Sequence, residues 1–172
     1  MEELPPTDAV DQEEMKHSFK VLLSMKKEPG GQPLFYKTDG QRFKREKTIK
    51  LNSKCQYRMD LSFTPPRGVE SVNFNGGLLE VREVTRDSTA SAYSSFFHTQ
   101  DFDPTKKGQR REVCVLITLK DAGDLRLTIQ LKCYDKDNVQ HSEWGSNFHC
   151  IEYLCEELAD PSAVEVVKET FR

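Results

Sequence analysis

In the stretch CQYRMDLSF (residues 55–63), apolar and polar side chains alternate without a break. Successive side chains of a β-strand point to opposite faces, so the pattern predicts a strand with one face in a hydrophobic core. The stretch DLRLTIQLKCY (124–134) repeats the pattern, and EVCVLITL (112–119) is apolar on both faces, as expected of a central strand. The inward positions of the two alternating stretches are Cys55, Tyr57, Met59, Leu61, Phe63, Leu125, Leu127, Ile129, Leu131 and Cys133.

Turn-forming residues separate the predicted strands. Asp39-Gly40 and Asn75-Gly76-Gly77 each lie between strand-like flanks, where glycine accepts the positive φ of a tight hairpin turn. TPPRG (64–68) and DAGD (121–124) end strands in a similar way. Many short strands with such turns, and no alternation of strands with helices, predict an all-β fold. We expect an antiparallel β-sandwich or flattened barrel of immunoglobulin-like type, with little helix.

The last residues allow two interpretations. Asp160-Pro161 has the form of a helix N-cap followed by proline at the first helical position. Val164, Val167 and Phe171 would then share one face of the helix. The run VEVV (164–167) would serve equally well in a strand, so the conformation of residues 160–172 stays open.

Composition limits the classes of function. The 172 residues are 36% hydrophobic and 31% charged, with a formal net charge of -3, so nothing indicates nucleic-acid binding. No apolar run approaches the ~20 residues that span a bilayer. The beginning of the chain lacks the features of a secretory signal, so we expect a cytoplasmic protein. Residues 1–17 are acidic and contain two adjacent prolines, which predicts a disordered tail before one domain of residues 18–172.

No pattern of catalytic or metal-binding residues stands out. The five cysteines show no C-x-x-C spacing, and Cys150 and Cys155 are an odd number of residues apart, so they would face opposite sides of a strand. His149 and Cys150 are sequence neighbours, which also point apart on a strand and make a poor nucleophile pair. We expect thiols that fill the core, and neither catalytic residues, nor a metal, nor a cofactor.

The stretch EWGSNFHCIEYLCEEL (143–158) holds the single tryptophan. Trp144-Gly145-Ser146 is typical of a turn that enters a strand, and we expect the indole to cover one end of the core. In that strand Phe148, Cys150 and Leu154 would face one way, and Ile151, Tyr153 and Cys155 the other. Glu152 would pair with a base or lie at an edge.

Three stretches of the sequence resemble the cannabinoid receptor interacting protein family. We expect segments of the form F-Y-K-x-D-G-Q-R-F, T-I-K-L and W-G-S-x-F-x-x-I-E-Y-x-C in that family. Here they lie, in this order, at residues 35–43, 48–51 and 144–155. Weaker similarities lie at residues 76–77, 104–110, 121–134 and 167–171, so the resemblance extends from about Phe19 to the end. Residues 1–17 and 84–99 depart from the family pattern.

The resemblance implies a non-enzymatic cytosolic protein that binds the cytoplasmic C-terminal tail of the type 1 cannabinoid receptor, a G-protein-coupled receptor, and modulates its constitutive signalling. It also implies a β-sandwich similar to Rho GDP-dissociation inhibitors. We would then expect recruitment to the cytoplasmic face of the plasma membrane through the partner. An alternative is a carrier that shields an acyl or prenyl anchor between the sheets, with a lipidated G-protein α subunit as a possible partner.

Two basic stretches, RFKREKTIK (42–50) and TKKGQRR (105–111), are either solvated edges or docks for an acidic peptide or an anionic membrane. The first suggests a receptor-tail site that combines aromatic anchors with charge, although both aromatic residues could equally be core. Its candidate residues are Tyr36, Arg42, Phe43, Lys44, Arg45 and Lys47. The candidates for lining a lipid pocket are Met59, Phe63, Phe74, Leu127 and Ile129.

Overall fold

The computed structural model describes residues 17–41, 44–159 and 163–172, and for residues 39–41, 44 and 45 it describes the backbone. Within these ranges the chain forms two sheets and a short helix, α2 (Val139–Ser142). Sheet A contains β1 (Ser18–Glu28), β4 (Gln56–Thr64), β7 (Val81–Arg86), β8 (Ser91–His98), β12 (Ile151–Glu157) and β13 (Val164–Phe171). Sheet B contains β2 (Leu34–Gln41), β3 (Lys44–Asn52), β5 (Val69–Phe74), β6 (Gly77–Leu79), β9 (Arg111–Leu119), β10 (Asp124–Tyr134) and β11 (Ser146–Phe148).

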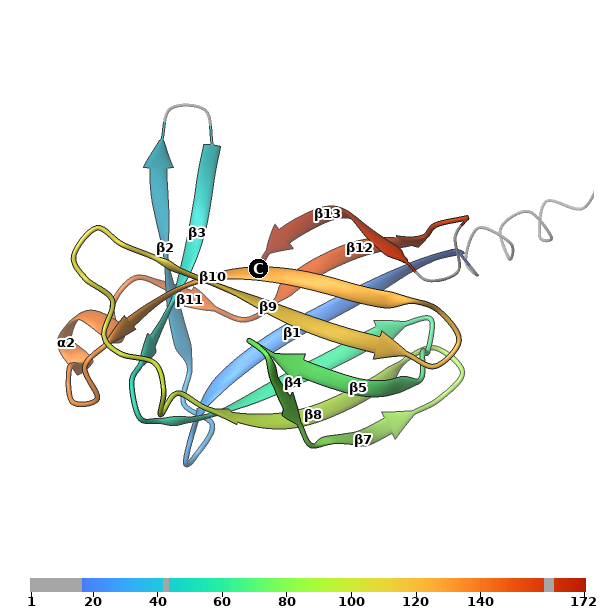
Figure 1. Cartoon of the computed structure of the whole chain (residues 1–172), viewed down its shortest axis with the longest axis horizontal. Helices are drawn as coiled ribbons and strands as arrows, with labels where there is room; N and C mark the ends of the chain where they lie inside the picture. Colours follow the sequence, from blue (N-terminus) through green and yellow to red (C-terminus); the bar gives the residue numbers. More distant parts are fainter. Residues whose placement is uncertain (1–16, 42–43, 160–162) are drawn as a thin grey trace, which may run out of the picture.

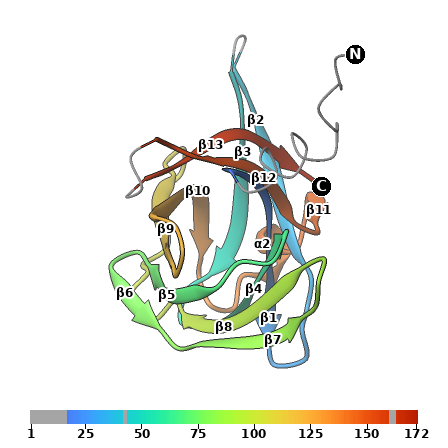
Figure 2. The same ribbon diagram turned by 90° about the vertical axis from the view of Figure 1, so that its right-hand side faces the viewer.

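The two sheets pack face to face as a β-sandwich (Figures 1 and 2). The strand order is β13-β12-β1-β4-β8-β7 in sheet A and β11-β2-β3-β10-β9-β5-β6 in sheet B. The predicted sandwich is confirmed, and the sheets do not close into a barrel. One pairing departs from the antiparallel expectation, because β3 and β10 run parallel.

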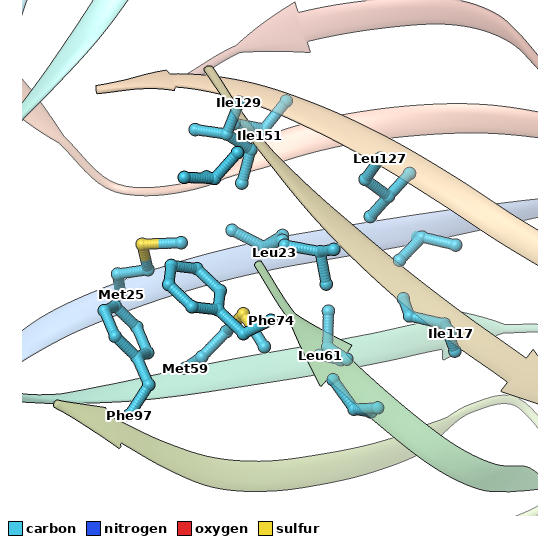
Figure 3. Packing of buried hydrophobic residues seen from close by; sticks show 14 of the residues in the cluster. Leu23, Met25, Met59, Leu61, Phe74, Phe97, Ile117, Leu127, Ile129 and Ile151 are labelled. Carbon is cyan, nitrogen blue, oxygen red and sulfur yellow. The ribbon is translucent and has the colours of Figure 1, made fainter. Parts of the chain in front are cut away.

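The core lies where the alternating strands of the two sheets face each other. The inward side chains of β4, from Tyr57 to Phe63, are at most 1% exposed, and those of β10 are at most 2% exposed. In Figure 3, Met59 and Leu61 of β4 point toward the same interior as Leu127 and Ile129 of β10. The period-two prediction is confirmed for both strands. In β9 the second face is only half-buried, so that strand is central in its sheet without being enclosed on both faces.

One predicted turn is confirmed and another is displaced. Asn75 and Gly76 form the two-residue connection between β5 and β6, with φ of 49° and 87°. These positive angles are those of a tight hairpin turn. Asp39-Gly40, by contrast, lies within β2, where Asp39 pairs with Glu46. The two strands form a hairpin, but they stay paired beyond Asp39-Gly40 as far as Gln41 and Lys44, in the register that buries Ile49.

The last third of the chain decides one open alternative and corrects two expectations. Of the two interpretations of the C-terminal segment, the strand is correct, since the alternating run from Val164 pairs with β12 as β13. Trp144 does not cover the core, because 72% of its side chain is exposed. Phe148 is buried in sheet B, whereas Leu154 is exposed on sheet A, so the two do not share a face. The turn into a strand is correct, since β11 begins at Ser146.

Strand β1 begins at Ser18, where the single domain was expected to start. The predicted acidic tail falls on residues 1–17, of which 1–16 lie outside the described residues, and it stays a prediction. In the described ranges there is no helix long and apolar enough to cross a bilayer.

Candidate functional site

Strands β3 and β10 diverge at one side of the sandwich. Their parallel pairing begins at Thr48 and Gln130, whereas the earlier part of β3 pairs with β2 alone. The hairpin of β2 and β3 therefore projects from the body of the molecule (Figure 1). On the other side of the gap lies β13, the edge strand of sheet A, which begins next to β10 at a bridge between Asp124 and Ala163. Strand edges from both sheets thus border one opening.

This opening is a groove of ≈ 530 Å³. We call it the fork groove. Its two walls and floor come from strands far apart in the sequence. It is lined by Glu46, Lys47, Glu112, Thr128, Ile129, Gln130, Glu169, Thr170 and Phe171. Three carboxylates and one ammonium group line it, so the described lining is acidic, unlike the basic dock predicted from the sequence.

Aromatic rings and one cation join the two sheets at the groove. Tyr36 of β2 packs on Phe171 of β13 with ring centroids 5.4 Å apart. Phe148 lies 5.9 Å from the same Phe171 ring. The Lys47 Nζ lies 5.2 Å above the Phe171 ring and 5.7 Å above the Tyr36 ring. Phe171 therefore connects the projecting hairpin to sheet A.

The position of Phe171 is fixed by the residue that follows it. The Arg172 guanidinium donates to Glu152, with Nε 2.7 Å from Oε2, and Lys20 Nζ lies 3.0 Å from Oε1 of the same carboxylate. The backbone N–H of Arg172 also donates to the carbonyl of Cys150, at 2.9 Å. The prediction that Glu152 pairs with a base is confirmed. These bonds to Arg172 hold the pKa of Glu152 below its usual range, with a smaller contribution from Lys20.

Glu169 has the opposite electrostatic environment. Although the residue is exposed overall, partial desolvation in the groove raises the pKa of its carboxyl group, and the nearby Lys47 opposes that shift. Glu169 pairs across the strands with Tyr153, whose buried hydroxyl has no hydrogen-bond partner among the described residues. The groove lining therefore contains a carboxyl group that is easier to protonate than usual, whereas the Tyr153 hydroxyl is buried and is not part of that lining.

The structure places the predicted receptor-tail residues as follows. Tyr36 is half-buried, so its exposure is intermediate between that of a core residue and that of a surface anchor. Lys47 lines the fork groove. Arg42 and Phe43 lie outside the described residues, and Lys44 and Arg45 are described by their backbone in β3. Of this set, the structure brings Tyr36 and Lys47 together, at Phe171.

The predicted lipid-pocket residues are all in the core. Met59, Phe63, Phe74, Leu127 and Ile129 are between 0% and 6% exposed and belong to one packed cluster. Figure 3 shows four of them, Met59, Phe74, Leu127 and Ile129, pointing into the same interior. Ile129 also lines the fork groove, so it connects the two sets of candidates.

Sequence reasoning missed the contribution of β13. Glu169 and Phe171 were not candidates, because the C-terminal segment could be a helix or a strand and its partners could not be deduced. The alternation of VEVVKETF was the available signal. Only the crossing of β13 toward sheet B, which no local pattern encodes, brings these residues to the hairpin.

The thiols and histidines do not form a site. All five cysteines are free thiols, and burial raises the pKa of Cys155 to about 12. Within the described residues no three histidine, cysteine, aspartate or glutamate side chains are grouped closely enough to hold a metal ion.

The arrangement is that of a β-sandwich with an open groove between strand edges, a form that can accept an extended peptide segment. Residues 15–171 match the family model described as CB1 cannabinoid receptor-interacting protein 1. The chain is 32% identical to the protein of that name from Homo sapiens and 31% identical to the one from Mus musculus. Both matches extend over 155 residues, or 88% of this chain and 94% of the relative. The chain belongs to the CB1 cannabinoid receptor-interacting protein 1 family.

Proposed function

We propose that this chain binds the cytoplasmic tail of a type 1 cannabinoid receptor and modulates its constitutive signalling. The observation that carries the proposal is family membership over residues 15–171, a range that includes every strand of the fork groove. The relatives are named for their interaction with the CB1 receptor. The receptor tail would recruit the chain to the cytoplasmic face of the plasma membrane.

The fork groove is the site we propose for the tail. An extended segment placed there can pair with the open edge of β13, and its side chains can contact Phe171 and Tyr36. Main-chain pairing supplies affinity, and the aromatic contacts add specificity. The acidic lining favours a segment with basic residues beside Glu46 and Glu112, whereas the basic hairpin favours acidic residues further along the same segment.

Calorimetric titration with a synthetic receptor-tail peptide tests this site. We expect Phe171→Ala to weaken binding at least tenfold, about 1.4 kcal/mol, because an aromatic anchor is removed. Reversal of Arg42, Lys44, Arg45 and Lys47 to Glu should also weaken binding without unfolding the domain. The matched control reverses four exposed cations elsewhere, namely Lys26, Arg82, Lys106 and Lys107. Unchanged affinity in both test variants would exclude this site. An equal loss of affinity in the control would mean that the fourfold charge reversal weakens binding only through the net charge of the chain.

Carriage of a lipid anchor is a second candidate function, and one observation favours it. Ile129 faces both the core and the fork groove, so an acyl chain that entered the groove would meet apolar side chains at its floor. Each buried CH₂ would contribute about 0.8 kcal/mol. Titration with a lipidated peptide and its unlipidated twin separates the two functions. Equal affinities would exclude carriage, and a large gain for the lipidated peptide would establish it.

A further inference from the structure

The outer face of sheet B brings together the two basic stretches that are separate in the sequence. Lys50 of β3 pairs directly with Lys132 of β10. Arg110 comes just before Arg111, whose partner in β10 is Leu131, so Arg110 lies beside Lys132. Lys37 is on the same face of β2, opposite Thr48. Burial lowers the pKa of Lys50, and repulsion by Lys37, Arg110 and Lys132 lowers it further.

The same face carries a fixed and exposed tryptophan. The ammonium group of Lys50 donates to the carbonyl oxygens of His141 and Trp144, at 3.0 Å and 2.5 Å, and lies 5.3 Å from the centroid of the Trp144 ring. Gly145 has a φ of 131°, and a Cβ at this position would lie 2.8 Å from the carbonyl oxygen of Tyr36. The backbone here is therefore held against β2 while the indole, 72% exposed, points outward.

Further basic residues lie on the loop before β9. The loop before β9 is attached to the end of β10, where the Thr105 N–H donates to the Cys133 carbonyl at 2.8 Å, and it carries the exposed Lys106 and Lys107. In α2, Val139 is 49% exposed. Acidic residues of this face and of the adjoining segment offset part of the positive charge; they are Glu46, Glu112, Asp135, Asp137 and Glu143.

We propose that this outer face, which we call the Trp144 face, docks directly on an anionic phospholipid surface. Tryptophan prefers the interface between headgroups and hydrocarbon, and lysine or arginine next to it is attracted to anionic lipid. Receptor-tail binding would bring the chain to a membrane only through its partner, so this contact is independent of the proposed function. An acidic peptide is the less suitable occupant, because protein hot-spot aromatics lie in desolvated pockets and Trp144 is mostly in solvent.

The single tryptophan of the chain reports on its own contact. The full chain is titrated with vesicles of phosphatidylcholine alone and with vesicles that contain ~30% phosphatidylserine. We expect a blue shift of the emission and protection from iodide quenching with the anionic vesicles alone. Raising the salt to about 1 M, where the Debye length is about 3 Å, should reverse both changes. An absence of any shift, or an equal shift with both kinds of vesicle, would overturn the proposal.

Charge reversal on the Trp144 face gives a second readout by vesicle flotation. Reversal of Arg110 and Lys132 to Glu should lower the partition coefficient at least about 30-fold, since each basic residue contributes about fivefold. The matched control reverses Lys26 and Arg82, both exposed on sheet A. If the test variant fails to fold by circular dichroism, Lys106→Glu with Lys107→Glu replaces it. An equal loss in the control, or the same emission shift produced by polyglutamate without vesicles, would contradict membrane docking.

Discussion

Strands β3 and β4 differ in how far their outward-facing polar side chains are exposed to solvent. In β4 the outward residues Arg58, Asp60 and Ser62 are half-exposed, as alternation predicts. In β3 the corresponding Thr48, Lys50 and Asn52 are between 1% and 5% exposed. The cover over β3 comes from the segment after β10, where Asn52 donates to the carbonyls of Asp135 and Asn138 at 2.9 and 3.1 Å. A strand can therefore bury polar side chains when a distant segment provides their hydrogen-bond partners.

The largest effect on stability should come from the apolar face of β4. Phe63 is fully buried and lies 5.9 Å from the Tyr93 ring and 6.5 Å from the Phe19 ring. We expect Phe63→Ala to lower the free energy of unfolding by about 3–5 kcal/mol, because it removes buried area and leaves a cavity. Phe96→Ala is the control on the same sheet, since Phe96 is 50% exposed. Urea denaturation that gives equal losses for the two variants would contradict this account of the core.

A smaller effect should come from the polar face of β3. Replacement of Lys50 by Met keeps the length of the side chain but removes the donor for the carbonyls of His141 and Trp144. We expect a loss of about 1–3 kcal/mol, the cost of buried acceptors without partners. The segment that it holds should also loosen, which faster acrylamide quenching of Trp144 would show.

Lys132→Met is the control for this prediction. Lys132 is half-buried on the same face and next to Lys50 in the ladder. Its replacement changes the charge equally but leaves both carbonyls with their donor. If Lys50→Met were as stable as Lys132→Met and its tryptophan no more accessible to acrylamide, then Lys50 would not hold the segment that contains His141 and Trp144 in place.

The comparison of the two strands also shows what could be predicted from the sequence. Period-two alternation identified the sandwich and the inward residues of β4 and β10, because burial there depends only on which face a side chain occupies. It could not foresee that Trp144 is exposed, because that depends on where Lys50 and Gly145 hold the backbone. Nor could it identify the fork groove, whose Glu169 and Phe171 reach the hairpin only through the crossing of β13.

The smallest effects should be opposite pH dependences of two glutamates on paired strands, Glu152 of β12 and Glu169 of β13. The pKa of Glu152 is lowered by Arg172 and then Lys20, so its ion pairs stabilise the fold above a pH of about 4.5, its unperturbed pKa. That stability is lost as the pH falls through the lowered pKa. The pKa of Glu169 is raised by partial desolvation. The stability that its protonated form contributes is therefore complete below the unperturbed pKa, and it is lost as the pH rises through the raised pKa.

Urea denaturation of Glu152→Gln and Glu169→Gln over this range of pH distinguishes the two cases. We expect Glu152→Gln to be less stable than the unchanged chain at neutral pH and to approach it in acid. Glu169→Gln should match the unchanged chain in acid and become the more stable of the two as the pH rises, because it avoids ionisation of a carboxyl that the groove partly desolvates. The same sign of pH dependence in both variants would mean that Glu169 is hydrated like a surface residue. The fork groove would then not be a desolvated site.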